Sequence, residues 1–153
     1  MGKICEIEKW IFIEGKKLSI KAPIKLDRTY LSKPVVLNKK GNGVWAELAT
    51  LAKFHEEGYD GVWLDTFHRK TWKSKDEIIE FDSLPKKIKE ILGTKRGGRW
   101  DLIIWKKGKI KFVELKRISE DPIRPNQRDF MSRLLRKGFK RNNFLIVEWD
   151  YKK

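Results

Sequence analysis

The chain has 153 residues, a length that suits a single domain with one hydrophobic core. Its 36 basic residues exceed its 21 acidic residues and give a net charge of +15, which favours a polyanionic partner over a basic one. The lone cysteine, Cys5, excludes an internal disulfide and a cysteine-rich zinc site, and no apolar run approaches the roughly 20 residues of a membrane-spanning helix.

The first 40 residues read as short extended segments. Residues 4–15 and 16–26 show partial alternation of apolar and polar side chains, and Gly15 can turn a hairpin between them. The lysines of this segment suit either a basic arm that faces a substrate or a solvated edge hairpin protected from aggregation. We expect a basic β extension over residues 1–40, followed by a boundary at residues 39–43.

A helix is predicted after this boundary. Val44, Leu48, Leu51 and Ala52 recur at helical spacing, and the pattern stops at Gly58.

A strand over Tyr59–Phe67 is predicted next. Residues 68–99 then read as an irregular basic insertion, with a short helix over Leu84–Leu92 that Gly93 ends.

Two apolar strands, residues 100–106 and 109–116, follow the insertion. They are separated by Lys107-Gly108, a tight turn that predicts an antiparallel hairpin.

A third helix is expected from Pro125 to about Lys137, with Gly138 as its stop, and residues 143–151 read as a closing buried strand. The order helix, strand, strand, strand, helix, strand predicts an α/β core over residues 41–153, in which helices flank a mixed sheet.

Three charged residues of the predicted hairpin form the strongest candidate site. Residues two apart on a strand share a face, so Glu114 and Lys116 project the same way. Asp101 opens the preceding strand and lies toward the same end of the sheet if the hairpin forms. Two carboxylates beside an ammonium group suit hydrolysis of a phosphodiester with Mg²⁺ or Mn²⁺, although an exposed pair on a half-solvated strand is the common reading of Glu114 and Lys116 alone.

Two polar residues lie on apolar helix faces. Gln127 shares a face with Phe130 and Leu134, and Glu47 lies among apolar residues of the first helix. A buried amide or carboxylate needs partners. Gln127 either bonds the backbone or steadies Glu114 and Lys116, and Glu47 either forms a salt bridge or adds a ligand to the metal site.

The segments 43–63 and 98–139 together resemble the PD-(D/E)XK nuclease superfamily, and most closely its VRR-NUC branch. The resemblance rests on a strand with the pattern E-x-K, here Glu114 to Lys116, before a helix that carries a glutamine. It extends over about residues 43–150 and does not include the first 40. One departure is Trp100, which stands where the family usually has proline.

The resemblance implies a restriction-endonuclease-like core and cleavage of DNA with Mg²⁺ or Mn²⁺. It makes Asp101 and Glu114 metal ligands, Lys116 the catalytic lysine, Glu47 the acid of the first helix and Gln127 the helix glutamine. Structure-specific nucleases occur in this branch, and similar small nucleases resolve four-way Holliday junctions as dimers. We therefore expect branched or distorted duplex DNA as the substrate and a homodimer.

Several further residues are weaker candidates. His68 and Asp65 can approach a metal, although a loop histidine more often lies on the surface or contacts phosphate. Trp72, set among lysines, is the best tryptophan for stacking on a base. The residues expected to contact nucleic acid are Arg69, Lys70, Trp72, Lys73, Arg96, Arg99, Arg124 and Arg128.

Two other functions remain open at this point. The first alternative to a DNA nuclease is a non-catalytic nucleic-acid-binding module. It leaves the clustered acids unexplained, because carboxylates repel phosphates unless a metal intervenes. The second is a nuclease on the same fold that acts on RNA. The N-terminus lacks the apolar stretch of a signal peptide, so we expect a cytoplasmic protein with no membrane partner.

Overall fold

A computed structural model describes residues 35–37, 43–74, 76–94, 96–117 and 124–149. The predicted hairpin within the first 34 residues lies outside this part of the chain. No helix in the described part is long and apolar enough to cross a membrane.

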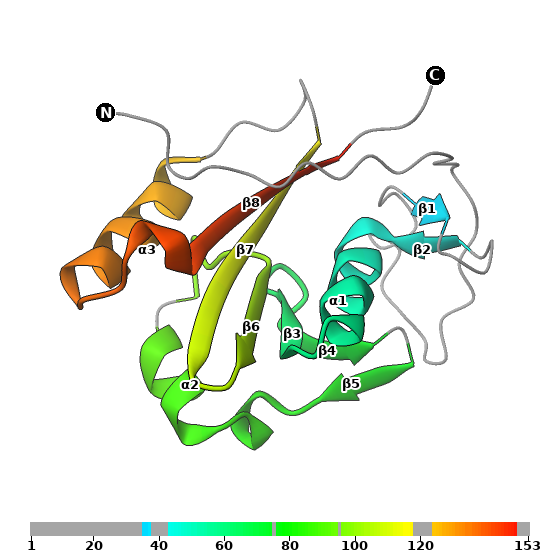
Figure 1. The fold of residues 1–153 in the computed structure, drawn as a ribbon, viewed down its shortest axis with the longest axis horizontal. Coiled ribbons are helices and arrows are strands. Elements are labelled where there is room, and N and C mark those ends of the chain that lie inside the picture. Colours follow the sequence, from blue (N-terminus) through cyan, green and yellow to red (C-terminus); the bar gives the residue numbers. More distant parts are fainter. Residues whose placement is uncertain (1–34, 38–42, 75, 95, 118–123, 150–153) are drawn as a thin grey trace.

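A six-stranded mixed sheet forms the centre of the fold (Figure 1). Its strand order is β5-β4-β3-β6-β7-β8, and neighbouring strands are antiparallel except for the parallel pair β7 and β8. The strands are β3 (Asp60–Asp65), β4 (Lys70–Ser74), β5 (Glu77–Ile79), β6 (Leu102–Lys106), β7 (Lys109–Arg117) and β8 (Phe144–Trp149).

Helices lie on both faces of this sheet. The helices are α1 (Ala46–Glu56), α2 (Lys86–Leu92) and α3 (Pro125–Arg136). The smaller elements are β1 (Val35–Leu37) and β2 (Gly43–Trp45), which pair as a separate antiparallel ribbon, and the short 3₁₀ helices η2 (Phe81–Ser83) and η3 (Arg141–Asn143). This arrangement confirms the predicted α/β class with a mixed sheet flanked by helices.

The two faces of the sheet form two apolar clusters. Leu51 of α1 packs in one cluster with Val113 and Leu115 of β7, and Leu134 of α3 packs in the other with Phe112 of β7. Alternate residues of β7 therefore serve opposite faces, as its sequence requires. The even-numbered residues of β7 face α3, so Glu114 and Lys116 project toward that helix.

The β6–β7 hairpin forms as predicted. Lys107 and Gly108 both have positive φ, 48° and 80°, as a two-residue turn of the favoured hand requires. The strands pair with Leu102 opposite Val113, so Asp101 lies beside Glu114 at the open end of the hairpin. The helix predicted to begin at Pro125 is also confirmed, since α3 runs from Pro125 to Arg136.

Two predictions about the elements are wrong. The first helix begins at Ala46 rather than Val44, because residues 43–45 pair with β1 as strand β2. Residues 70–74 and 77–79 are not irregular but form β4 and β5, which widen the sheet beyond β3. Their cations obscured the pattern, yet Trp72 is fully buried and stacks on Trp63 with ring centroids 5.4 Å apart.

Candidate active site

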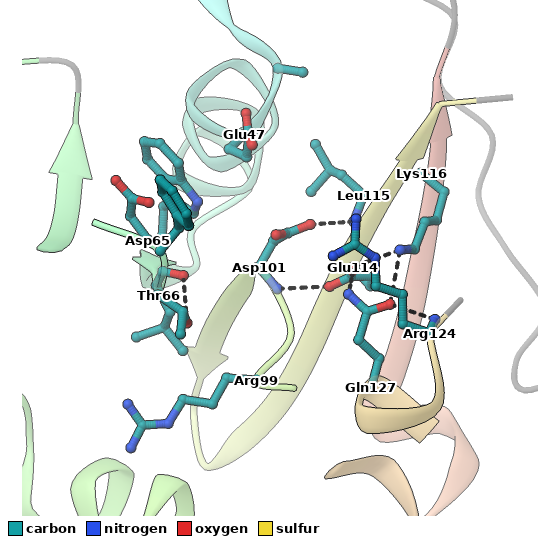
Figure 2. A pocket seen from close by; sticks show the side chains of 14 residues that line it. Glu47, Asp65, Thr66, Arg99, Asp101, Glu114, Leu115, Lys116, Arg124 and Gln127 are labelled. Atoms are coloured by element: carbon teal, nitrogen blue, oxygen red, sulfur yellow. Dashed lines mark hydrogen bonds and ion pairs between the residues drawn. The ribbon is translucent and has the colours of Figure 1, made fainter. Parts of the chain in front are cut away.

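A cavity of about 370 Å³ opens where β3, β6 and β7 meet the start of α1 and the start of α3 (Figure 2). Its charged lining residues are Glu47, Asp65, Arg99, Asp101, Glu114, Lys116 and Arg124. The structure thus brings Asp101, Glu114, Lys116, Gln127 and Glu47 to one cavity, as expected from the sequence.

Main-chain amides hold the two central carboxylates. The amide of Asp101 donates to Oε1 of Glu114 at 3.0 Å, and the amide of Leu115 donates to Oδ2 of Asp101 at 2.8 Å. Each strand of the hairpin therefore orients the acid of the other strand. A third bond, from the amide of Leu64 to the carbonyl of Asp101 at 2.7 Å, ties this point to β3.

Glu114, Lys116 and Gln127 form a closed polar triad (Figure 2). Nζ of Lys116 lies 3.1 Å from Oε2 of Glu114 and donates to Oε1 of Gln127 at 2.9 Å. Nε2 of Gln127 donates to the same Oε2 of Glu114. The ammonium group is therefore held as a donor between two oxygens on the α3 side of β7.

Burial perturbs Glu114. Its side chain is only 3% exposed, and this burial raises the pKa of its carboxyl group, while Lys116 and the hydrogen bonds from Asp101 act in the opposite direction. A buried carboxylate is costly unless a cation or donors compensate it. The site is thus arranged so that an added positive charge would favour the ionised acid.

The start of α3 positions Gln127. Pro125 occupies the first helical position, and Oε1 of Gln127 accepts a hydrogen bond from the amide of Arg124 at 3.0 Å, as a residue three positions after the N-cap can. The side chain that meets Lys116 therefore also caps its own helix.

Trp100 links the strand of Asp101 to this helix. Its indole is 1% exposed, packs against Phe144 with centroids 5.2 Å apart, and donates to the carbonyl of Gln127 at 3.0 Å. Close approach of the two backbones also requires Gly98, whose φ is +80° and where a Cβ atom would lie 2.2 Å from the carbonyl oxygen of Asn126. The residue that departs from the usual family motif thus has a structural role of its own.

Glu47 faces the cavity from the opposite side. It is half-buried on the first turn of α1 (Figure 2). Within the described ranges, no three Asp, Glu, His or Cys side chains lie close enough to form a metal site by themselves. Glu47 therefore lines the same cavity as Asp101 and Glu114 but does not form a close cluster with them.

The expected nucleic-acid contacts divide into three groups. Arg99 and Arg124 line the first cavity, and Arg69, Lys70, Arg96 and again Arg99 line a second cavity of similar size. Lys73 and Arg128 are exposed but lie outside the lining of both cavities.

Trp72 corrects an expectation. It is 0% exposed, and its indole donates to Oδ2 of Asp65 at 3.3 Å, so it cannot stack on a base.

Arg99 lines both cavities. It donates to the carbonyl of Gly93 at 2.6 Å and covers the ring of Phe81. Burial, and then the charges of Arg96 and Arg133, lower the pKa of its guanidinium group. The Nε atoms of Arg99 and Arg133 are buried without a hydrogen-bond partner among the described residues.

Asp65 and His68 form a nearly buried pair. Nδ1 of His68 lies 2.8 Å from Oδ1 of Asp65, and both side chains are nearly buried, with 9% and 6% exposed. Between them in sequence, Phe67 is 79% exposed and lines the first cavity. Sequence reasoning missed Phe67 because its apolar character made it read as the last residue of the preceding strand.

Comparison with known proteins supports the resemblance. A family model described as the VRR-NUC domain matches residues 66–143, just over half of the chain. No curated protein and no solved structure matches the chain at a significant level.

Proposed function

Because the chain belongs to the VRR-NUC family, whose domains are nucleases of the PD-(D/E)XK type, we propose that it is a divalent-metal-dependent DNA endonuclease that hydrolyses phosphodiester bonds. The catalytic groups in this proposal are Asp101, Glu114 and Lys116, with Gln127 and Glu47 in supporting positions. The observation that carries it is the buried Glu114 carboxylate, which shares one cavity with a second carboxylate and an ammonium group.

The donor set suits Mg²⁺ or Mn²⁺. Both ions prefer hard oxygen ligands, and Mg²⁺ commonly takes one or two carboxylates and completes its shell with water and substrate phosphate. Asp101 and Glu114 would hold the ion. When bound, it would supply positive charge to the phosphate and make a coordinated water more acidic.

Lys116 acts in this proposal as a fixed positive charge. Its Nζ atom lies within hydrogen-bonding distance of Glu114 and Gln127, so its position is fixed by two acceptors. Such a group stabilises charge that develops on the phosphate oxygens during cleavage. The alternative role as the base that activates water would require Lys116 to lose a proton while it is paired with a carboxylate.

Arginines on both sides of the carboxylates would bind the DNA backbone. Arg124 extends from the start of α3 into the first cavity (Figure 2), and Arg99 joins that cavity to the second one. A phosphate beside Arg99 would offset the repulsion from Arg96. These contacts position the backbone and do not read sequence.

Cleavage assays with substituted proteins test the proposal. Labelled four-way junction, flap, single-stranded and linear duplex DNA would be incubated with Mg²⁺, Mn²⁺ or EDTA. Asp101→Asn and Lys116→Met should each lower the rate of cleavage by about 100-fold or more while DNA binding persists. Lys109→Met is the matched control for charge, since Lys109 is exposed at the far end of the same strand.

The outcomes separate the candidate functions. Metal-dependent cutting that Asp101→Asn abolishes supports the nuclease, and matched RNA substrates decide between DNA and RNA. Tight binding without cutting under any metal would instead indicate a binding module. A preference for four-way junctions would point to a dimer with two active sites related by a twofold axis, which light scattering of the purified protein can test.

A further inference from the structure

We propose that Phe67 stacks on an unpaired nucleobase beside the scissile phosphate, and that the site therefore acts on DNA with an unpaired or displaced nucleotide at the point of cleavage. This inference rests on the proposed function and narrows its substrate class. It is carried by the position, exposure and support of one aromatic side chain.

Phe67 is unusual in this protein. Among the side chains that the structure describes, it is the one large apolar group that is exposed, at 79%. A single exposed phenylalanine is ordinary on a protein surface. Phe67, however, lines the cavity that contains Asp101, Glu114 and Lys116, so a bound strand would pass its ring.

The turn that carries Phe67 is anchored to the sheet through its neighbour His68. The ring of His68 meets that of Phe67 edge to face, with centroids 4.9 Å apart. His68 is bound to Asp65 at 2.8 Å, and Asp65 also accepts from the buried indole of Trp72. The aromatic ring is thus exposed while the residue behind it is anchored in the core, an arrangement that reduces the entropy lost on binding.

The surroundings favour a nucleic-acid base over another apolar ligand. Asp65 and Thr66 line both cavities, and the second cavity continues to Arg69, Lys70 and Arg96. An aromatic face beside a basic groove is the arrangement by which proteins hold single-stranded nucleic acid. In an intact duplex the base faces are covered by their neighbours, so stacking on Phe67 requires a base that has left the helix.

The test compares Phe67→Ala with Phe67→Tyr on two kinds of DNA. On a forked or flapped substrate, Phe67→Ala should weaken binding and slow cleavage about ten-fold, since it removes the stacking contact with one base. Phe67→Tyr should retain most of both. On linear duplex, the alanine variant should differ from the unsubstituted protein by less than about two-fold.

A second variant and a modified substrate isolate the stacking contact. Phe67→Leu keeps an apolar side chain but lacks the aromatic face, so it should resemble Phe67→Ala. An abasic site is then introduced at each position around the fork. At the position that stacks, loss of the base should weaken binding by the unsubstituted protein and remove most of its advantage over Phe67→Ala.

Failure of this inference can be told from failure of the nuclease. Binding is measured by fluorescence anisotropy without metal, so the stacking contact can be tested even if the protein cuts no DNA. If the unsubstituted protein cuts forked DNA but Phe67→Ala and Phe67→Leu bind and cut it equally well, the stacking role is wrong and the nuclease stands. Equal losses at every abasic position would also overturn it.

Discussion

Replacing Trp100 tests whether its indole, rather than a proline, holds the active-site strand against α3. Trp100→Ala removes a ring that is 1% exposed and deletes the hydrogen bond to the carbonyl of Gln127. Loss of a buried tryptophan costs about 3–5 kcal/mol, a large part of the stability of a typical domain. At about 2–4 °C per kcal/mol for a chain of this size, the midpoint of thermal unfolding should fall by about 6–20 °C.

Trp100→Phe separates packing from hydrogen bonding. Phenylalanine keeps a ring against Phe144 but cannot donate to Gln127, so we expect a loss of about 1 kcal/mol and a fall of about 2–4 °C. Calorimetry or circular dichroism measures both variants, and cleavage is assayed below their midpoints. A fall smaller than about 3 °C for Trp100→Ala, or equal falls for both variants, would refute this account of the position.

Three further predictions concern the same site. Gln127→Leu removes the partner shared by Lys116 and Glu114 and should lower kcat about 10- to 100-fold with a smaller change in KM. Single-turnover and steady-state kinetics with the DNA substrate that the unsubstituted protein cleaves would measure this. Burial raises the pKa of Glu114, and its protonated form cannot bind metal, so the affinity for Mn²⁺ should fall as the pH is lowered, beginning at a higher pH than for an exposed glutamate. Calorimetric titrations between about pH 8 and pH 5 would test this, and an affinity that does not change with pH would contradict it. Gly98→Ala should destabilise the fold by at least about 2 kcal/mol through its positive φ and its approach to α3, whereas Gly97→Ala, which has open space, should have little effect in the same denaturation experiment.

The β6–β7 hairpin and its charged residues could be predicted because the signals are local. Lys107-Gly108 selects a tight turn, and strand geometry then fixes that Glu114 and Lys116 share a face. The relation of Asp101 to Glu114 follows from the register of that hairpin. Gln127 was also predictable as an amide on the inner face of its helix, where it is half-buried, since the helix has a clear start and one apolar face.

The missed features depend on pairing between distant residues. Strand β4 contains Lys70 and Lys73, and its place in the sheet depends on Trp72 packing on Trp63 rather than on its own sequence pattern. For the same reason the sequence alone makes Trp72 the best tryptophan candidate for stacking on a base. Phe67 is the reverse case, because an apolar residue next to a strand gives no local sign that it faces solvent.

The bonds between the acids and the strand amides affect how knockouts of this protein should be interpreted. Asp101→Ala would deprive the amide of Leu115 of its acceptor, and Glu114→Ala would do the same to the amide of Asp101. Loss of activity in an alanine variant would therefore have two explanations, disrupted pairing of β6 with β7 or the loss of a carboxylate needed for metal binding. Asn in place of Asp101 keeps an acceptor for that amide, so its loss of activity would report on chemistry alone.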